Sequence, residues 1–346
     1  MDCLHLGAAV PVMPFFLSNE ITNVVNIGGS ITVGYNSTNL ETLSWRALLR
    51  AWMPGAFLTK SFKSINSGAS GTPSWYGLVR LQTDLIDHNP GLVFIDFAVN
   101  DPGTSGGERT DDFIPASEAI IRKIRGALPN TKIVVLIFTK PENYTAGVGT
   151  VARDAWINIA ATYGLEVYRL DTYLETLMPV PYSDEDIDVY YTVSDVHPID
   201  AGHAAIAAQV EAGLTSLTNP ATNPLPARIY AESEDYEQDP IIRTGIDNDG
   251  ETGTWVTSGT ARQSSTANST ISWTGTFCSF GLDTLNGAGG GVLAWDVDGG
   301  GYTNIDTENT KSTGQVYAVW NTTRNVHTVT IKVVSGTVKI NRFLAI

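Results

Sequence analysis

Two polar residues that are far apart in the sequence could together perform nucleophilic catalysis. Ser30 follows two glycines at the end of the apolar run Asn23–Ile27, and His197 lies in a loop that precedes a predicted helix. In open parallel sheets, ligands bind at the carboxyl ends of the strands, where glycines let the chain turn sharply. A serine hydroxyl becomes a good nucleophile when an imidazole takes its proton, so the pair predicts acyl transfer. Taken singly, Ser30 also fits a helix N-cap and His197 an incidental loop histidine.

Acyl transfer also needs hydrogen-bond donors for the negative charge that builds on the carbonyl oxygen. The glycine-rich segment Asn66–Thr72 follows a second apolar run, and Asn100 follows a third. A glycine amide and an asparagine side chain at adjacent strand ends can converge on one point. Each segment alone would also fit an ordinary turn.

The elements that must position these residues alternate along the first two thirds of the chain. Apolar runs predict buried strands at Asn23–Ile27, Phe62–Ile65, Leu92–Phe97, Lys132–Phe138 and Leu165–Arg169. Apolar residues at helical spacing predict helices at Thr42–Met53, Pro115–Ala127 and Val151–Tyr163. This alternation predicts an α/β domain with a parallel sheet covered on both faces.

A further helix is predicted after His197. Its apolar face consists of Ile206, Val210, Leu214 and Leu217. We expect Asp200 to be the N-cap of this helix and His203, which lies inside it, to have a structural role.

The composition and the hydropathy pattern of the sequence change after the proline-rich stretch Thr218–Pro226. Residues 228–346 are rich in Gly, Thr, Ser and Asn and contain short runs that alternate between polar and apolar residues, which is typical of an all-β sandwich, here expected to be a jelly roll. We therefore expect an N-terminal arm (1–21), an α/β domain (22–217), a linker (218–227) and a β-sandwich (228–346). The aromatic residues of the last domain could stack on sugars or fill its core: Trp273, Trp295, Trp320, Tyr302 and Tyr317.

Four motifs occur in a fixed order: Gly-x-Ser at a strand end, Asn-x-x-x-x-Gly, Val-Asn-Asp and Asp-x-His-Pro. This order resembles the SGNH (GDSL-like) hydrolase superfamily over about residues 22–217, and some segments resemble a subgroup associated with polysaccharide deacetylation. The resemblance implies a flavodoxin-like three-layer α/β/α fold and a serine esterase. It implies Ser30 as nucleophile and His197 as base, with the oxyanion held by the amides of Ser30 and Gly71 and by the Asn100 side chain.

The chain departs from the pattern of the superfamily at two places. Gly29 stands where many relatives have an aspartate that is not catalytic. The acid usually lies three residues before the histidine, where this chain has Ser194, and we expect Asp195 to take that role. The alternative is a Ser–His dyad in which a backbone carbonyl orients the imidazole. More distant carboxylates that could serve are Asp186 and Asp188.

The composition of the chain limits the classes of molecule that it is expected to bind. The chain has 36 acidic and 21 basic residues and a formal charge of −15, so nucleic acid is not an expected partner. No apolar run approaches the roughly 18 residues of a membrane helix, and two cysteines provide neither a disulfide framework nor a multi-cysteine zinc site. No metal or cofactor is expected.

The resemblance points to O-acetyl groups on a polysaccharide or oligosaccharide as the substrate. The alternatives are a lipid or aryl esterase on the same fold and a non-catalytic protein that binds glycan or builds a virion. The low lysine content and the polar tail suit an extracellular or virion-associated setting.

Overall fold

The computed structural model describes residues 22–56, 62–101, 113–138, 150–179, 183–191, 196–215, 225–231, 233–284, 290–306 and 315–346. The chain divides into two compact units. The first, called here the α/β unit, comprises Met1–Pro73, Arg80–Asp101 and Ile124–Ala227. The second, the β unit, comprises Ser74–Val79, Pro102–Lys123 and Arg228–Ile346. The predicted arm (1–21) and most of the predicted linker lie outside the described residues, and the expected domain boundaries stay a prediction.

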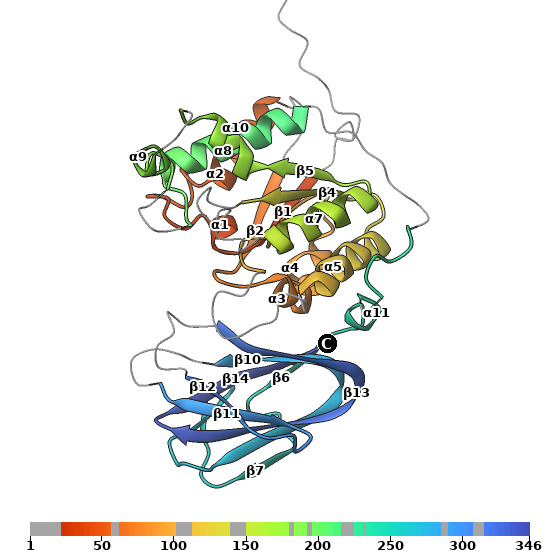
Figure 1. Cartoon of the computed structure of the whole chain (residues 1–346), viewed down its shortest axis with the longest axis vertical. Coiled ribbons are helices and arrows are strands. Elements are labelled where there is room, and N and C mark those ends of the chain that lie inside the picture. The colour runs from red at the N-terminus through yellow and green to blue at the C-terminus, as the bar shows by residue number, and fades with distance from the viewer. Residues whose placement is uncertain are drawn as a thin grey trace, which may run out of the picture. The chain divides into compact units, whose positions relative to one another are not determined.

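A five-stranded parallel sheet forms the centre of the α/β unit (Figure 1). Its strand order is β2-β1-β3-β4-β5, which is the flavodoxin-like order. The strands are β1 (Thr22–Gly28), β2 (Phe62–Gly68), β3 (Leu92–Asp96), β4 (Lys132–Ile137) and β5 (Glu166–Arg169). The predicted α/β fold class is therefore confirmed.

Burial explains why the inner strands are continuous apolar runs. All residues of β3 and β4 are buried, because helices cover both faces of a parallel sheet. One face packs against α2 (Trp45–Ala56), α8 (Leu170–Thr176) and α10 (Asp200–Thr215), and Figure 1 shows α7 (Thr150–Thr162) on the other side of the sheet. Strand β2 lies at the edge and is only partly buried.

Helix α2 starts three residues later than the apolar pattern predicts. The Ser44 hydroxyl accepts the N–H of Ala47, which is the hydrogen bond of an N-cap. The helical spacing of apolar residues continues upstream of this cap, so periodicity alone placed the start at Thr42.

Short helices complete the described parts of the α/β unit. They are α1 (Ser30–Val33), α4 (Leu81–Asp84), the 3₁₀ helix η2 (Ile86–His88) and α9 (Asp184–Ile187). The β unit includes the helices α3 (Ser74–Val79) and α11 (Ser233–Tyr236), and α5 (Phe113–Ala127) begins in it. In the described part of the chain, no helix is long and apolar enough to cross a membrane.

The β unit contains an antiparallel sheet that follows the order β12-β11-β13-β10-β14-β9-β8, with β6 paired to β14 and β7 to β10. The strands are β6 (Ile241–Thr244), β7 (Gly250–Thr252), β8 (Val256–Ser258), β9 (Ala261–Ser264), β10 (Thr270–Thr284), β11 (Val292–Val297), β12 (Thr303–Asp306), β13 (Gln315–Ser335) and β14 (Val338–Ala345). The predicted all-β second domain is confirmed, while its description as a jelly roll stays a prediction.

The aromatic residues of this sheet divide between core and surface. Trp273 is fully buried and stacks on Phe343 at a centroid distance of 5.3 Å. Trp295 is partly buried and packs on the core of the sheet, whereas Tyr302 is exposed beneath the Lys332 ammonium, which lies 3.8 Å from its ring centroid. The side chains of Trp320 and Tyr317 lie outside the described residues.

Candidate active site

Ser30 occupies a sharp turn where β1 passes directly into α1. The N–H of Gly29 donates to the Asp96 carbonyl at 3.1 Å, which ties this turn to the end of β3. A Cβ on Gly28 would lie 2.4 Å from both the Asp96 carbonyl oxygen and the Thr32 Oγ1, so only glycine fits there. The close packing fixes the backbone of Ser30 at the carboxyl edge of the sheet.

His197 meets Ser30 at this edge. The distance between His197 Nε2 and Ser30 Oγ is 2.6 Å, which is a short hydrogen bond. Pro198 forms an isolated β-bridge with Tyr191, and the N–H of Ile199 donates to the Tyr190 carbonyl at 2.9 Å. These contacts hold the loop that carries His197 just before α10. The structure thus brings together the two residues that the sequence proposed as nucleophile and base.

Tyr35 adds an aromatic side chain that sequence reasoning missed. Its ring centroid lies 4.5 Å from that of His197 with a tilt of 52°, and half of its surface is exposed. Its N–H donates to the Ser30 carbonyl at 3.0 Å. The one signal in the sequence was its place five residues after Ser30, which by itself does not show where the ring lies.

The backbone of Tyr35 is held by His203, which is fully buried in α10. His203 Nε2 lies 3.1 Å from the Tyr35 carbonyl, and its Nδ1 lies 3.4 Å from the Trp45 N–H. Nε2 must therefore donate and Nδ1 accept, which describes a neutral imidazole. Burial lowers the pKa of His203, in keeping with this state. These contacts agree with the structural role expected for this histidine.

Asp200 binds another loop instead of capping its own helix. It is the first residue of α10, and its carboxylate accepts the N–H of Thr38 at 2.8 Å and the Thr38 hydroxyl at 2.6 Å. The cap expected from the sequence is wrong, because a partner from a distant loop uses both carboxylate oxygens. Asp200 and His203 together anchor the segment that follows α1.

Asn100 lies between the two loops that should supply the other oxyanion donors. Its Nδ2 donates to the Thr72 carbonyl at 3.2 Å, so it contacts the residue next to Gly71. A Cβ built on Gly29 would lie 1.9 Å from the same Nδ2, which places the amide directly against the turn that carries Ser30. Gly71 itself is exposed and has φ +71°, a left-handed conformation that favours glycine.

The structure describes some of the carboxylates proposed as partners of His197 and not others. Asp195 lies outside the described residues, as does Ser194. Asp186 is partly exposed, and its carboxylate accepts the N–H and the hydroxyl of Ser183 at 2.7 Å each; these bonds lower the pKa of Asp186. Asp188 follows α9 in a turn.

Asp96 is a buried carboxyl group that the sequence analysis did not single out. One oxygen accepts the Thr32 hydroxyl at 2.9 Å, and the other is buried without a hydrogen-bond partner. Burial, with a smaller contribution from the nearby Asp101, raises the pKa of Asp96 to about 7, while the Thr32 hydroxyl opposes the shift. An aspartate in the otherwise apolar run of β3 was the available signal.

The described residues contain no group of three His, Cys, Asp or Glu side chains that could hold a metal ion.

Comparisons with known proteins identify a matching family and solved structures of similar fold. The model of the GDSL-like lipase/acylhydrolase family matches residues 27–205. A search of curated protein sequences finds no match. Among solved structures, the chain is similar to a two-domain esterase (CEX) active on acetylated mannans, co-crystallized with mannopentaose, at a TM-score of 0.76 and 21% identity, with 94% of this chain and 91% of that chain covered.

A second structure of a two-domain esterase active on acetylated mannans gives a TM-score of 0.74 at 20% identity, again covering 94% of this chain and 91% of that one. At this identity the likeness establishes the shared two-domain fold. The family match spans just over half of the chain, from the end of β1 into α10, and includes every residue of the site described above. The chain belongs to the GDSL-like lipase/acylhydrolase family.

Proposed function

We propose that this protein is a serine esterase that removes small acyl groups, chiefly O-acetyl, from a carbohydrate. The observation that carries the proposal is the 2.6 Å contact between Ser30 Oγ and His197 Nε2 at the carboxyl edge of the sheet. A nucleophile within hydrogen-bond reach of a base is the arrangement that activates a serine hydroxyl.

The reaction follows from the positions of these groups. Ser30 Oγ attacks the ester carbonyl while His197 Nε2 takes the hydroxyl proton, giving a tetrahedral intermediate with a negative oxygen. The Ser30 and Gly71 amides and the Asn100 side chain stabilise that oxygen. The intermediate collapses, the bond from the acyl carbon to the sugar oxygen breaks, and protonated His197 gives its proton to that oxygen, which leaves as a hydroxyl. Water, deprotonated by His197, then releases the acyl group as a carboxylic acid and restores Ser30.

We propose Asp195 as the group that orients the imidazole of His197. In a triad, replacing this acid by its amide costs about 10⁴-fold in kcat, because the imidazole takes the wrong tautomer. Asp195→Asn should therefore lose activity on that scale if the triad operates. A loss below about tenfold would favour the dyad, in which a backbone carbonyl holds Nδ1.

Two features support a carbohydrate as the leaving group. Tyr35 presents a half-exposed ring beside His197, and aromatic faces pack well on sugar rings. The solved structure of similar two-domain fold is an esterase active on acetylated mannans.

The test is acetate release from a panel of acetylated glycans that includes acetylated mannan, with Ser30→Ala as the control. We expect release from at least one glycan and none from the variant. Nitrophenyl esters of increasing chain length test the acyl site, and activity should fall steeply beyond butyrate.

Two other outcomes would assign a different function. Activity that rises with chain length would favour a lipid or aryl esterase. Glycan binding without hydrolysis in the parent would favour a binding or structural protein.

A further inference from the structure

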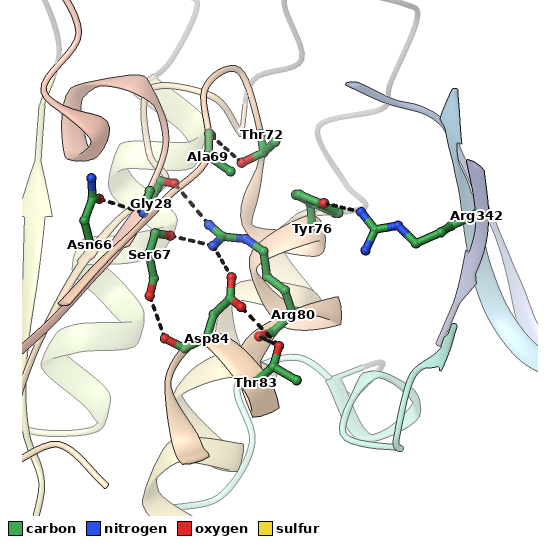
Figure 2. A network of polar contacts seen from close by, with 11 residues as sticks. Gly28, Asn66, Ser67, Ala69, Thr72, Tyr76, Arg80, Thr83, Asp84 and Arg342 are labelled. Carbon is green, nitrogen blue, oxygen red and sulfur yellow. Dashed lines mark hydrogen bonds and ion pairs between the residues drawn. The ribbon is translucent and has the colours of Figure 1, made fainter. Parts of the chain in front are cut away.

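The guanidinium of Arg80 lies at the ends of the two strands that lead to Ser30 and to Gly71 (Figure 2). Its Nη1 donates to the Ser67 carbonyl at 2.5 Å, and its Nη2 donates to the Gly28 carbonyl at 3.2 Å. Ser67 is the next-to-last residue of β2 and Gly28 is the last residue of β1, and the two strands are parallel neighbours. One side chain therefore bridges the two strand ends.

A carboxylate makes this buried cation tolerable. The Arg80 side chain is 10% exposed, and its Nη1 lies 2.7 Å from the Asp84 carboxylate, which is 34% exposed. A buried guanidinium is costly unless it is paired and hydrogen-bonded. Ser67 Oγ also donates to the Asp84 carbonyl at 2.6 Å, so the end of α4 is tied directly to β2. Lysine could not replace the two terminal nitrogens of the guanidinium, which bind both carbonyls at once, because its ammonium is a single point charge.

The contacts continue from this bridge to the proposed oxyanion donors. The Ala69 N–H donates to the same Gly28 carbonyl at 2.8 Å. The Thr72 hydroxyl donates to the Ala69 carbonyl at 2.7 Å, and Asn100 Nδ2 donates to the Thr72 carbonyl at 3.2 Å. The loop that contains Gly71 is thus held between the strand end that Arg80 binds and the side chain of Asn100.

We propose that Arg80 is a positioning residue for ester hydrolysis, which fixes the spacing between the amides of Ser30 and Gly71. The inference rests on the proposed function, because it assumes that both amides bind the oxyanion. Ser30 comes two residues after Gly28, and Gly71 three residues after Gly68, so a shift between the strand ends changes the distance between the two amides. Oxyanion donors act over about 2.7–3.1 Å, and small displacements reduce their effect steeply.

The test uses two variants. Arg80→Lys keeps the positive charge but cannot bind both carbonyls at once, and Asp84→Asn removes the ion pair with the guanidinium. We expect kcat for p-nitrophenyl acetate to fall about 10- to 100-fold in Arg80→Lys with little change in KM. A boronic acid that forms a tetrahedral adduct with Ser30 should bind more weakly by the same factor. Asp84→Asn should show a smaller loss in both measurements.

Arg262→Lys serves as the matched control. Arg262 lies in the β unit, is 16% exposed, and donates to both oxygens of the Glu251 carboxylate. This variant should lose thermal stability without a change in kcat or in boronate affinity. A purely structural role for Arg80 would give the same result as Arg262.

Two results would overturn the proposal. One is a folded Arg80→Lys enzyme with unchanged kcat and boronate affinity, whatever its melting temperature. If Arg80→Lys does not fold, Asp84→Asn becomes the test of the proposal. An Asp84→Asn enzyme with the same kcat and boronate affinity as the parent then refutes the inference. Ser30→Ala separates the two proposals: an active Ser30→Ala enzyme refutes the proposed function, whereas an inactive one with parent-like Arg80→Lys refutes only the role of Arg80.

Discussion

A methyl group on residue 29 should disable the side chain of Asn100 without touching Ser30 or His197. The Cβ of Gly29→Ala would lie 1.9 Å from Asn100 Nδ2. Gly29 has φ −87° and ψ −149°, so alanine would not need a left-handed conformation, although this ψ lies about 30° beyond the edge of the β region. In this chain Asn100 occupies the space that a Cβ at position 29 would need, so the collision with the amide is the main consequence expected of the substitution.

The size of the effect follows from the displacement. Non-bonded carbon and nitrogen atoms need about 3.5 Å, so the amide must move by roughly 1.5 Å. A donor shifted that far from the oxyanion no longer makes a hydrogen bond. Loss of one oxyanion donor costs about 10²- to 10³-fold in kcat, or about 3–4 kcal/mol. We expect Gly29→Ala to lose activity on this scale with a small change in KM.

A double-mutant cycle separates this mechanism from general damage. The assay is kcat for p-nitrophenyl acetate in the parent, Gly29→Ala, Asn100→Ala and the double variant. Because both substitutions remove the same donor, the double variant should be no slower than Asn100→Ala. Additive losses, or a Gly29→Ala enzyme as active as the parent, would refute the assignment of Asn100 to the oxyanion.

Three further predictions concern the surroundings of the site. Tyr35→Leu should lower kcat about tenfold while Tyr35→Phe stays near the parent, because only the ring contacts His197; steady-state kinetics with a small acetate ester checks this. The pKa of Asp96 is raised from 3.8 to about 7 in the folded protein, so its carboxyl keeps a proton that the unfolded chain releases, and its cost to stability grows between about pH 4 and pH 7. Asp96→Asn should therefore gain up to a few kcal/mol relative to the parent across that range, and urea unfolding at pH 5 and pH 8 should show a larger gain at pH 8. The pKa of His203 is lowered, so protonation of the unfolded chain should cost stability below about pH 6.5, and His203→Gln should unfold with a weaker dependence on pH from 5 to 7.

The sequence supported the fold because local patterns and packing agree in the strands. The runs around Leu92 and Lys132 are apolar throughout, and the sheet buries them on both faces. The start of α2 was placed wrongly because the cap at Ser44 is a local hydrogen bond that apolar spacing does not register.

Within the site, the residue types at strand ends pointed to Ser30 and Asn100, the loop before a predicted helix pointed to His197, and the resemblance to the superfamily pointed to Gly71. The residues that position these side chains could not be predicted, because their contacts join segments that are distant in the sequence. Arg80 was indistinguishable from any surface arginine, and Asp200 had the appearance of a simple helix cap. Asp96 stands out in the sequence as the aspartate of an apolar strand, but its complete burial depends on the packing of the folded chain.

The account depends on Ser30 being a nucleophile activated by His197. Its most direct test is covalent labelling with an organophosphonate that carries a good leaving group, followed by mass spectrometry of the digested protein. We expect a single adduct on the peptide that contains Ser30, and labelling slower by at least about 10³-fold in His197→Ala. An adduct on another residue, or equal labelling rates in the parent and in His197→Ala, would contradict the account.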